Sequence, residues 1–400
     1  MVKTELLQQR IKALHKEFNQ FVPDASIAQF FYAPGRINLI GEHTDYNGGL
    51  VLPAAIDISI IAAARKRDDR MLHLKSMNFP ESISASLDGL SFEKERDWAN
   101  FPLSAAWALK NNGIEVCGAD IVFQGDIPLG SGLSSSAAIE VLMMQVLLSL
   151  SGKQPEKKQI PILCRKGEND FIGVKSGIMD QFIITFGEEG HALYLDCSDL
   201  ENRLVPFCNA DEVAIIVGNT KVKRELAKSA YNQRVEECEE GLGLFRKFLN
   251  RDSLSSISEI TLHELNQYKD RMPAVIANRC EHVIAENDRV KQAAEALENG
   301  NLSKLGALLN ASHESLKNLY EVSCVELDAI VDAFRESDSV FGARMTGAGF
   351  GGSAIALVEA DKADEVIETA RKIYREKTGI DGEFYIAHIA DGVKRLAPEQ

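Results

Sequence analysis

The feature that most constrains the fold is a long apolar segment, Ser134–Leu150, which follows a turn rich in glycine and serine. Charged or amide side chains interrupt it only at Glu140 and Gln145, so a helix formed here would have no polar face for solvent. The residues before the turn, Ala119–Phe123, have the apolar composition of a strand. This order predicts an α/β domain built around a buried central helix, which Gly152 ends.

The length of the chain predicts a second domain. Its 400 residues exceed the roughly 250–300 residues at which a single core stops growing. With 45% apolar and 26% charged residues, the composition is that of a globular protein and excludes disorder or a fibre. We expect an N-terminal domain at 1–205 and a C-terminal domain at 206–400, with no Pro, Gly or Ser linker marking the boundary at 205–212.

Apolar periodicity and turn residues give a coarse order of elements. In the first half we expect helices at Glu5–Phe18, Pro102–Lys110 and Pro155–Asp170 and strands at Phe30–Ala33, Ile37–Ile40, Ile56–Ala64, Met71–Lys75, Ile83–Leu87 and Ala192–Asp196. In the second half we expect strands at Val213–Gly218, Ser353–Val358 and Phe384–Ile389, long helices across Leu226–Phe334 with breaks at Asp252–Ser256 and Glu298–Asn301, and a helix at Ala363–Lys377.

Charge and hydropathy exclude several classes of partner. The 44 Lys and Arg against 59 Asp and Glu give a net charge of −15, which would repel the phosphate backbone of a nucleic acid. The longest apolar stretches, Ala54–Ala64 and Ala137–Leu150, are shorter than the roughly 20 residues that span a bilayer. We therefore expect neither a nucleic-acid nor a membrane partner.

The cysteines and the N-terminus indicate the compartment. The charged, amphipathic start does not resemble a secretory signal. Seven cysteines, Cys208 among them, are scattered singly along the chain without the close pairs of a zinc or disulfide framework. We predict a cytoplasmic protein, and a monomer because no heptad run is present.

The turn Pro128–Ser136 has the character of a phosphate-binding loop. Glycines allow close backbone approach, and the free N–H groups at the start of the following helix attract anions. No GK[ST] follows, so it is not a Walker A loop, and Ser135 replaces the third glycine of a dinucleotide-binding motif. The alternative is an ordinary capped turn between strand and helix.

A second glycine cluster, Thr346–Ser353, contains Gly347, Gly349 and Gly352 in the spacing GxGxxG. A strand rather than a helix follows it, so the dinucleotide-binding interpretation fails. The small residues still predict close backbone approach, either to a ligand or to another element in a tight turn.

The densest polar cluster is Pro34–Gly49. Glu42, His43, Thr44 and Asp45 are adjacent groups able to hydrogen-bond several hydroxyls, a pattern suited to a sugar, although exposed polar loops are also common. A metal site is disfavoured because no second His or Cys lies at a ligand spacing.

A fourth segment, Glu168–Gln181, carries two carboxylates, Glu168 and Asp180, separated by Gly173 and Gly177. One could hold Mg²⁺ and the other could orient or deprotonate a hydroxyl, as phosphoryl transfer requires. Alone, Asp180 would more often be a carboxylate stabilised at the start of a helix.

These motifs, in this order, resemble those of the GHMP family of small-molecule kinases. The family's three motifs correspond to Pro34–Asn47, Pro128–Ala138 and Met345–Ser353, and Gly177–Gln181 is similar to its catalytic segment. Gly35–Asn47 resembles the sugar-binding signature of members that phosphorylate galactose. The resemblance implies Mg²⁺-dependent transfer of the ATP γ-phosphate to the anomeric hydroxyl of D-galactose, the step that begins galactose catabolism.

The resemblance also assigns roles to residues. Asp180 is implied to be the catalytic carboxylate facing the anomeric hydroxyl, with Arg36 beside it to stabilise the carboxylate and the transferring phosphoryl group. The implied Mg²⁺ ligands are Ser136 and Glu168. The implied sugar-binding residues are Glu42, His43, Asp45, Gly177 and Tyr231. The implied ATP-binding residues are Gly130, Ser131, Gly132, Leu133, Ser134, Ser135, Ser136, Gly347 and Gly349.

The fold implied by the resemblance is α+β, with two parts and a site in the cleft between them. The N-terminal part would be an α/β domain related to domain 2 of ribosomal protein S5, and the C-terminal part a ferredoxin-like α+β domain. Three positions depart from the commonest family pattern, which puts fine specificity in question: Lys175, Ser176 and Ser353. Lys175 could tune affinity near the sugar O1 or the phosphates, or could be a solvated lysine.

Two alternatives stay open at this point. One is a kinase for a related sugar such as N-acetylgalactosamine or arabinose, against which Thr44 and Asn47 favour galactose by the resemblance. The other is a non-catalytic sensor that binds galactose and ATP, against which the intact loop Gly132–Ala138 argues. The residues that contact adenine are not identified by any motif.

Overall fold

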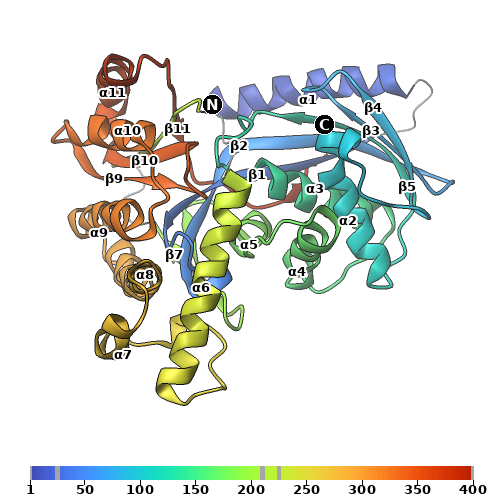
Figure 1. Ribbon diagram of the computed structural model, residues 1–400. Coiled ribbons are helices and arrows are strands. Elements are labelled where there is room, and N and C mark those ends of the chain that lie inside the picture. The colour runs from blue at the N-terminus through green and yellow to red at the C-terminus, as the bar shows by residue number, and fades with distance from the viewer. Residues whose placement is uncertain (1, 23–27, 208–211, 223–226, 398–400) are drawn as a thin grey trace.

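The computed structural model describes residues 2–22, 28–207, 212–222 and 227–397, which form two β-sheets with helices packed against them (Figure 1). The first sheet has the order β12-β1-β2-β5-β3-β4, and β6 extends it by pairing with β2 and β7. Its pairings are antiparallel except between β3 and β5. Its strands are β1 (Gln29–Ile40), β2 (Leu50–Arg67), β3 (Met71–Ser76), β4 (Ser82–Ser86), β5 (Gly118–Gly125), β6 (His191–Asp196), β7 (Asn202–Pro206) and β12 (Lys394–Arg395).

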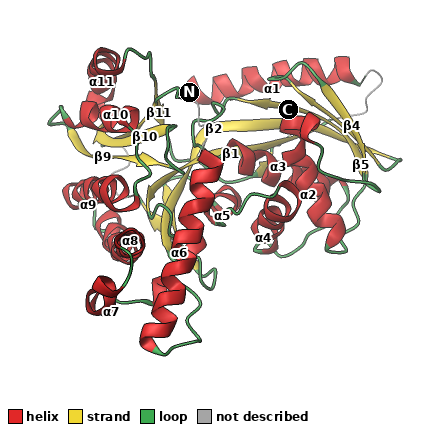
Figure 2. Ribbon diagram, in the orientation of Figure 1, coloured by secondary structure: helices red, strands yellow, loops and turns green. Residues whose placement is uncertain are grey.

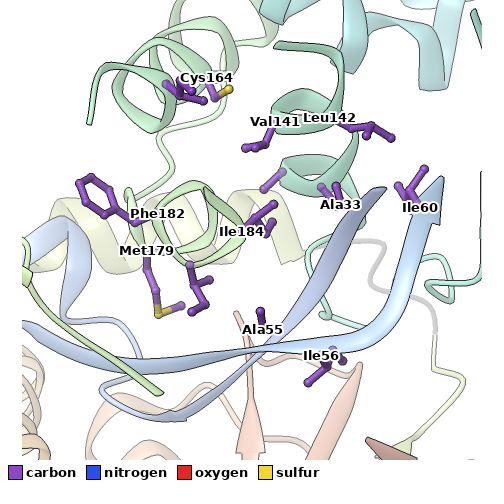
Figure 3. Packing of buried hydrophobic residues seen from close by; sticks show 14 of the residues in the cluster. Ala33, Ala55, Ile56, Ile60, Val141, Leu142, Cys164, Met179, Phe182 and Ile184 are labelled. Carbon is purple, nitrogen blue, oxygen red and sulfur yellow. The ribbon is translucent and has the colours of Figure 1, made fainter. Parts of the chain in front are cut away.

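Helices cover both faces of the first sheet (Figure 2). Helix α1 (Val2–Phe21) lies on one face, where Leu14 and Phe18 pack against β1, β2 and β5. The other face is covered by α2 (Asn100–Asn111), α3 (Ser135–Leu150), α4 (Gln159–Lys166) and α5 (Met179–Phe186). Figure 3 shows Val141 and Leu142 of α3 and Phe182 of α5 above strands β1 and β2. The predicted buried central helix is confirmed as α3.

The second sheet has four antiparallel strands in the order β11-β8-β10-β9. Its strands are β8 (Val213–Asn219), β9 (Val340–Thr346), β10 (Ser353–Glu359) and β11 (Glu383–Ala387). Helices α10 (Val325–Arg335) and α11 (Ala363–Thr378) pack on one face, where Ile330 and Phe334 meet Ile216. This β-α-β-β-α-β order with the first strand in the sheet interior is the ferredoxin-like arrangement that was expected.

A helical insertion separates β8 from β9 and connects the two parts of the molecule. It contains α6 (Ala227–Leu249), α7 (Leu262–Tyr268), α8 (Ala274–Glu298) and α9 (Leu302–Ser315). Val290 and Ala293 of α8 belong to the same buried cluster as α3 and the first sheet, so the core is continuous across the molecule. The boundary at 205/206 stays a prediction. Cys208 and Leu226, which entered the sequence predictions, lie outside the described residues.

Three expected elements differ from the structure. The strands expected at Phe30–Ala33 and Ile37–Ile40 form one strand, β1, which accommodates Pro34 and Gly35 through a shift in register against β2. The helix expected at Pro155–Asp170 is wrong in extent. It begins only at Gln159 and gives way to a π-helix, Gly167–Ile172, because α2 packs closely here: a Cβ at Gly167 would lie 2.7 Å from the carbonyl oxygen of Ser104.

Strands β7 and β9 and helix α5 were not expected, because short elements carry little periodicity. In the part of the chain that the structure describes, no helix combines the length and the apolarity required to cross a membrane.

Candidate active site

A cavity of about 340 Å³ collects residues from the two sheets and the helices between them. Its walls come from the end of β1, the first turn of α3, the π-helix at 167–172, the start of α5, helix α6 and the loop between β9 and β10. It brings together ten of the residues expected from the sequence: Arg36, Glu42, His43, Asp45, Ser136, Glu168, Gly177, Asp180, Tyr231 and Gly347.

The floor of the cavity is an ion pair between Arg36 and Asp180. Arg36 Nε lies 2.8 Å from Asp180 Oδ1 and Arg36 Nη2 lies 2.9 Å from Oδ2, so the guanidinium binds the carboxylate with both arms. Arg36 is only 5% exposed and also donates through Nη1 to the carbonyl of Gly132. Ser134 Oγ donates to Asp180 Oδ2. The carboxylate is therefore held rigidly beside the glycine and serine loop.

A strained turn after β1 carries the polar residues that face Asp180. Gly41 and His43 have positive φ angles of 102° and 63°, and such a conformation in a histidine is uncommon outside functional sites. Thr44 stabilises the turn because its Oγ1 lies 2.8 Å from the carbonyl of Gly41 and 2.7 Å from that of Leu50. The turn exposes His43, Asp45 and their neighbour Glu42 to the cavity.

Glu42 connects the turn to the second glycine cluster. Its Oε2 accepts a hydrogen bond from Asn38 Nδ2 at 2.7 Å, and its Oε1 accepts one from the backbone N–H of Gly347 at 2.6 Å. The buried guanidinium of Arg344 lies 3.4 Å from Oε1. The carboxylate thus joins the first sheet to the loop after β9 and fixes the width of the cavity there.

Burial shifts the pKa values of His43 and Asp45. Burial lowers the pKa of His43 to about 3, helped by the nearby His282, so the imidazole is neutral at physiological pH. Burial raises the pKa of Asp45 to about 6, and the charge on Asp180 adds to the effect. A neutral imidazole and a carboxylate that is ionised above about pH 6 are suited to hydrogen bonding with hydroxyl groups.

Glu168 lies in the π-helix, and it lines the same cavity as Ser136 of α3. Glu168 Oε2 accepts hydrogen bonds from Ser176 Oγ at 2.6 Å and from Gln181 Nε2 at 2.9 Å. Among the described residues no hydrogen bond reaches its Oε1. Burial raises the pKa of Glu168, while the bond from Ser176 opposes that shift.

Several residues expected to bind ATP do not line this cavity. Ser131 is buried and its Oγ donates to the carbonyl of Pro128 at 2.7 Å, while Leu133 packs in the apolar core. Gly349 packs against Val322. Gly130, Gly132, Ser134 and Ser135 belong to the same loop, of which Ser135 lines a neighbouring cavity.

The two glycine clusters contact one another. A Cβ at Gly347 would lie 3.0 Å from the carbonyl oxygen of Gly132, so this approach requires a residue without a side chain. Ser353 Oγ donates to the carbonyl of Ser131 at 2.8 Å. The close approach that the sequence predicted for Thr346–Ser353 is therefore made to the Pro128–Ser136 loop.

The neighbouring cavity, of about 430 Å³, was not predicted from the sequence. It shares Phe101 and Ser136 with the first cavity. Phe79 and Trp98 in its wall stack with ring centroids 5.8 Å apart and ring planes within 6° of parallel. These apolar residues come from scattered segments with no motif, so no local pattern in the sequence could have identified them.

The three positions that depart from the family pattern have different surroundings. Lys175 is exposed and lines neither cavity. Ser176 contacts Glu168 and Ser353 contacts the Pro128–Ser136 loop, as described above. Asn232, which was not predicted, lines the main cavity beside Tyr231, and its Oδ1 has no hydrogen-bond partner among the described residues.

Comparison with known proteins identifies the family. Residues 16–66 match the model of the galactokinase galactose-binding signature, residues 100–188 the N-terminal domain of GHMP kinases and residues 293–376 the C-terminal domain of GHMP kinases. The chain is 46% identical over 368 residues to a galactokinase of Staphylococcus carnosus, covering 91% of this chain and 94% of that protein. This chain belongs to the galactokinase family. A galactokinase of Enterococcus faecalis is 44% identical over 92% of this chain and 95% of its own length.

Solved structures agree with the galactokinase family and its GHMP kinase fold. The crystal structure of Lactococcus lactis galactokinase complexed with galactose superimposes with a TM-score of 0.92 at 40% identity, covering 96% of this chain and 100% of that one. Methanococcus jannaschii mevalonate kinase matches with a TM-score of 0.66 at 22% identity, which shows a common fold. The expected two-part GHMP kinase fold and the ATP-dependent sugar kinase family are both confirmed.

Proposed function

We propose that the protein transfers the γ-phosphoryl group of ATP to the anomeric hydroxyl of D-galactose, giving galactose 1-phosphate and ADP. The observation that carries this proposal is the Arg36–Asp180 pair, which lies on the floor of a cavity with hydroxyl-binding groups on one wall and a carboxylate and a helix N-terminus on the other. Membership of the galactokinase family supports the choice of galactose.

In this proposal the sugar occupies the part of the cavity beside Glu42, His43, Asp45, Gly177 and Tyr231. The anomeric hydroxyl faces Asp180, whose carboxylate accepts its proton or orients it toward the phosphorus. Arg36 keeps Asp180 in place and supplies positive charge next to the transferring phosphoryl group. Because both arms of the guanidinium bind the carboxylate, neither group is free to move away from the reaction path.

The nucleotide would bind across both cavities. The triphosphate would lie against the Pro128–Ser136 loop and the start of α3, where the first N–H groups of a long helix attract anions. The adenine would occupy the apolar cavity beside Phe79 and Trp98, which opens onto the main cavity at Ser136. Gly347 would close the phosphate site from the other sheet, whereas Gly349 packs against Val322.

The residues near the phosphate site fit Mg²⁺. This ion is held by one or two carboxylates together with substrate phosphates and water, and it prefers oxygen ligands. Ser136 offers a hydroxyl and Glu168 offers Oε1, which has no hydrogen bond among the described residues, while Ser176 and Gln181 orient the carboxylate through Oε2. When bound, the ion would neutralise charge on the phosphate oxygens.

The compartment and the assembly stay predictions from the sequence. The cytoplasmic location is supported by the scattered cysteines, six of which are free in the described residues, and the monomer by the lack of a heptad run in the sequence.

The proposal is tested by measuring ADP release from MgATP with galactose, glucose, N-acetylgalactosamine, arabinose, galacturonate and mevalonate, and by locating the product phosphate by ³¹P NMR. Turnover on galactose with a 1-phosphate product supports it. Preference for a different sugar would mean that the protein is a kinase but that galactose is not its substrate. Absence of turnover together with thermal stabilisation by galactose would favour a sensor.

A variant isolates the chemical step. Asp180→Asn should lower kcat by on the order of 10³-fold or more while galactose still binds, because it removes the carboxylate charge and keeps the shape. Asp361→Asn, an exposed carboxylate remote from both cavities, is the matched control. Retention of most of kcat in Asp180→Asn would contradict the assigned role.

A further inference from the structure

Next to the residues proposed to bind the sugar, a row of hydrogen bonds leads from the helical insertion between β8 and β9 to His43. Cys238 Sγ on α6 lies 3.1 Å from the hydroxyl of Tyr320. The Tyr320 hydroxyl lies 2.7 Å from that of Tyr46, which lies 2.9 Å from His43 Nδ1. The row joins segments that are far apart in the sequence and ends at a ring that faces the cavity.

Asn47 gives the row a direction. Its Nδ2 donates to the backbone carbonyl of His43 at 2.8 Å, which fixes the orientation of the amide because a carbonyl oxygen only accepts. The same Nδ2 lies 3.6 Å from Cys238 Sγ and can only donate to it. Among the described partners of Cys238, the acceptor left for the thiol proton is therefore the hydroxyl oxygen of Tyr320.

Each group in the row carries a single proton. Burial raises the pKa of Cys238 to about 11 and raises the pKa values of Tyr46 and Tyr320 well above their ordinary range, so all three stay protonated. If the thiol donates to Tyr320, then the Tyr320 hydroxyl donates to Tyr46, and the Tyr46 hydroxyl donates to His43 Nδ1. A neutral imidazole that accepts at Nδ1 carries its proton on Nε2.

We propose that the row Cys238–Tyr320–Tyr46 holds His43 as the Nε2–H tautomer, so that His43 acts as a hydrogen-bond donor to a sugar hydroxyl oxygen. His43 Nε2 is buried and makes no hydrogen bond of ordinary geometry among the described residues, although a backbone group of Ala348 lies close enough to the imidazole to raise its pKa; both residues line the cavity. The part of the inference that concerns the sugar rests on the proposed function. Tyr46, Tyr320 and Cys238 are positioning residues, because they act through His43.

Ring packing restrains the same histidine. The ring of Tyr320 packs against two imidazoles, with its centroid 4.8 Å from that of His43 and 4.6 Å from that of His282. Tyr320 is fully buried at the end of the π-helix Leu316–Tyr320, so its hydroxyl has little freedom to turn toward other partners. The row therefore determines both where the His43 ring lies and which of its nitrogens carries the proton.

The tautomer can be read directly from the ¹⁵N resonances of the histidine rings, in full-length protein labelled with ¹⁵N-histidine and free of substrate. We expect a pyridine-type Nδ1 and a pyrrole-type Nε2 for His43 between pH 6 and 8. His282 is an internal reference in the same spectrum, because its Nε2 lies 3.0 Å from the backbone carbonyl of Glu42 and must donate to it. Protonation of His43 at Nδ1 in the unaltered protein would overturn the proposal.

Variants test whether the row sets the tautomer. Cys238→Ala and Tyr320→Phe should move the two His43 resonances toward each other, as the direction of the remaining bonds is no longer fixed. Cys238→Ser should restore the original pattern, since a hydroxyl also accepts from Asn47 and donates to Tyr320. Cys280→Ala is the matched control, because Cys280 is buried in the same apolar cluster and has no place in the row. Unshifted His43 resonances in both Cys238→Ala and Tyr320→Phe would overturn the proposal.

Kinetics supply a second measurement. Cys238→Ala and Tyr320→Phe should raise KM for galactose by about three- to tenfold, the effect of weakening one hydrogen bond, with kcat within about twofold of the original. A fall in kcat at unchanged KM would contradict a role in sugar binding. The NMR measurement needs no substrate, so it tests the tautomer of His43 even if the protein does not act on galactose. A failure of the tautomer assignment can therefore be distinguished from a failure of the galactose assignment.

Discussion

The carboxylate of Asp45 occupies the space into which any side chain at Gly177 would project. A Cβ added at Gly177 would overlap the Asp45 carboxyl group, which lies at the start of the short helix Asp45–Asn47. The contact brings the turn after β1 against the segment before α5 and places Asp45 near Asp180. The absence of a side chain at Gly177 is therefore a condition for the shape of the proposed sugar site.

Gly177→Ala should weaken galactose binding by on the order of tenfold to a hundredfold, because the added methyl group displaces Asp45, and overpacking of this kind costs about 1–3 kcal/mol. Binding of galactose and of an ATP analogue can be measured by calorimetry, and the nucleotide affinity should change little. Gly243→Ala, at a helical position where a Cβ meets no atom within 4 Å, is the matched control. Equal galactose affinity in Gly177→Ala and the original protein would contradict the role of this contact.

The raised pKa of Asp45 predicts an acid limb in the activity profile. Above about pH 6 the carboxylate is ionised and accepts hydrogen bonds from sugar hydroxyls, whereas below that pH it gains a proton and loses acceptor capacity. We expect kcat/KM for galactose to fall by about tenfold per pH unit below pH 6. In Asp45→Asn the plateau should be lower and this limb should disappear. A limb that persists at pH 6 in Asp45→Asn would assign the titration to a different group.

The sequence predicted the residues that lie close together along the chain and act together. Glu42, His43 and Asp45 share one turn, and the Pro128–Ser136 loop adjoins the apolar helix that became α3. Such clusters are visible because both the backbone geometry and the chemistry depend on a few consecutive residues. The central helix could be predicted equally well, since a helix that is apolar on all sides has to be buried.

Contacts between distant segments could not be predicted. Cys238 and Tyr320 are 82 residues apart, and nothing in either local sequence indicates that their side chains meet. The apolar cavity beside Trp98 is likewise formed by residues from segments that are distant in the sequence. The π-helix at 167–172 was misjudged because its geometry depends on the close packing of Gly167 against α2, which is a tertiary effect. These features required the folded chain.

The departure at Ser176 predicts a change in metal affinity. Ser176 Oγ donates to Glu168 Oε2, so Ser176→Ala should weaken binding of Mg²⁺ with ATP by roughly tenfold, as expected for loss of a group that orients a metal ligand. Ser176→Cys should have an intermediate Mg²⁺ affinity, because a thiol is a weaker hydrogen-bond donor than a hydroxyl. Activity against free Mg²⁺ at fixed ATP measures this affinity. Ser84→Ala, on the exposed side of β4, is the control, and equal Mg²⁺ dependence in all variants would contradict a role of Ser176 in orienting a metal ligand.

The buried carboxyl group of Glu140 should make the free energy of unfolding depend on pH. Glu140 is fully buried on α3, where its carboxyl oxygens make no hydrogen bond of ordinary geometry, although the side chains of Gln181 and Ser104 lie close enough to oppose the rise of its pKa. Burial, with the nearby charge of Glu168, raises its pKa well above the ordinary range. The folded protein therefore keeps the proton at neutral pH, whereas the unfolded chain releases it above about pH 4.3. Folding stability from this group is fully present below that pH and is lost as pH rises, by about 1.4 kcal/mol per pH unit until the folded-state pKa is reached.

Glu140→Gln removes this dependence, because the amide is neutral in both the folded and the unfolded chain and keeps nearly the same volume. The Tm of Glu140→Gln relative to the original protein should therefore be higher at pH 8 than at pH 5, measured by calorimetry without nucleotide and with a chelator present. Glu81→Gln, an exposed position, should show the same Tm difference at both pH values. A Tm difference for Glu140→Gln that does not change with pH would contradict the raised pKa, because it would mean that Glu140 holds its proton equally in the folded and the unfolded chain.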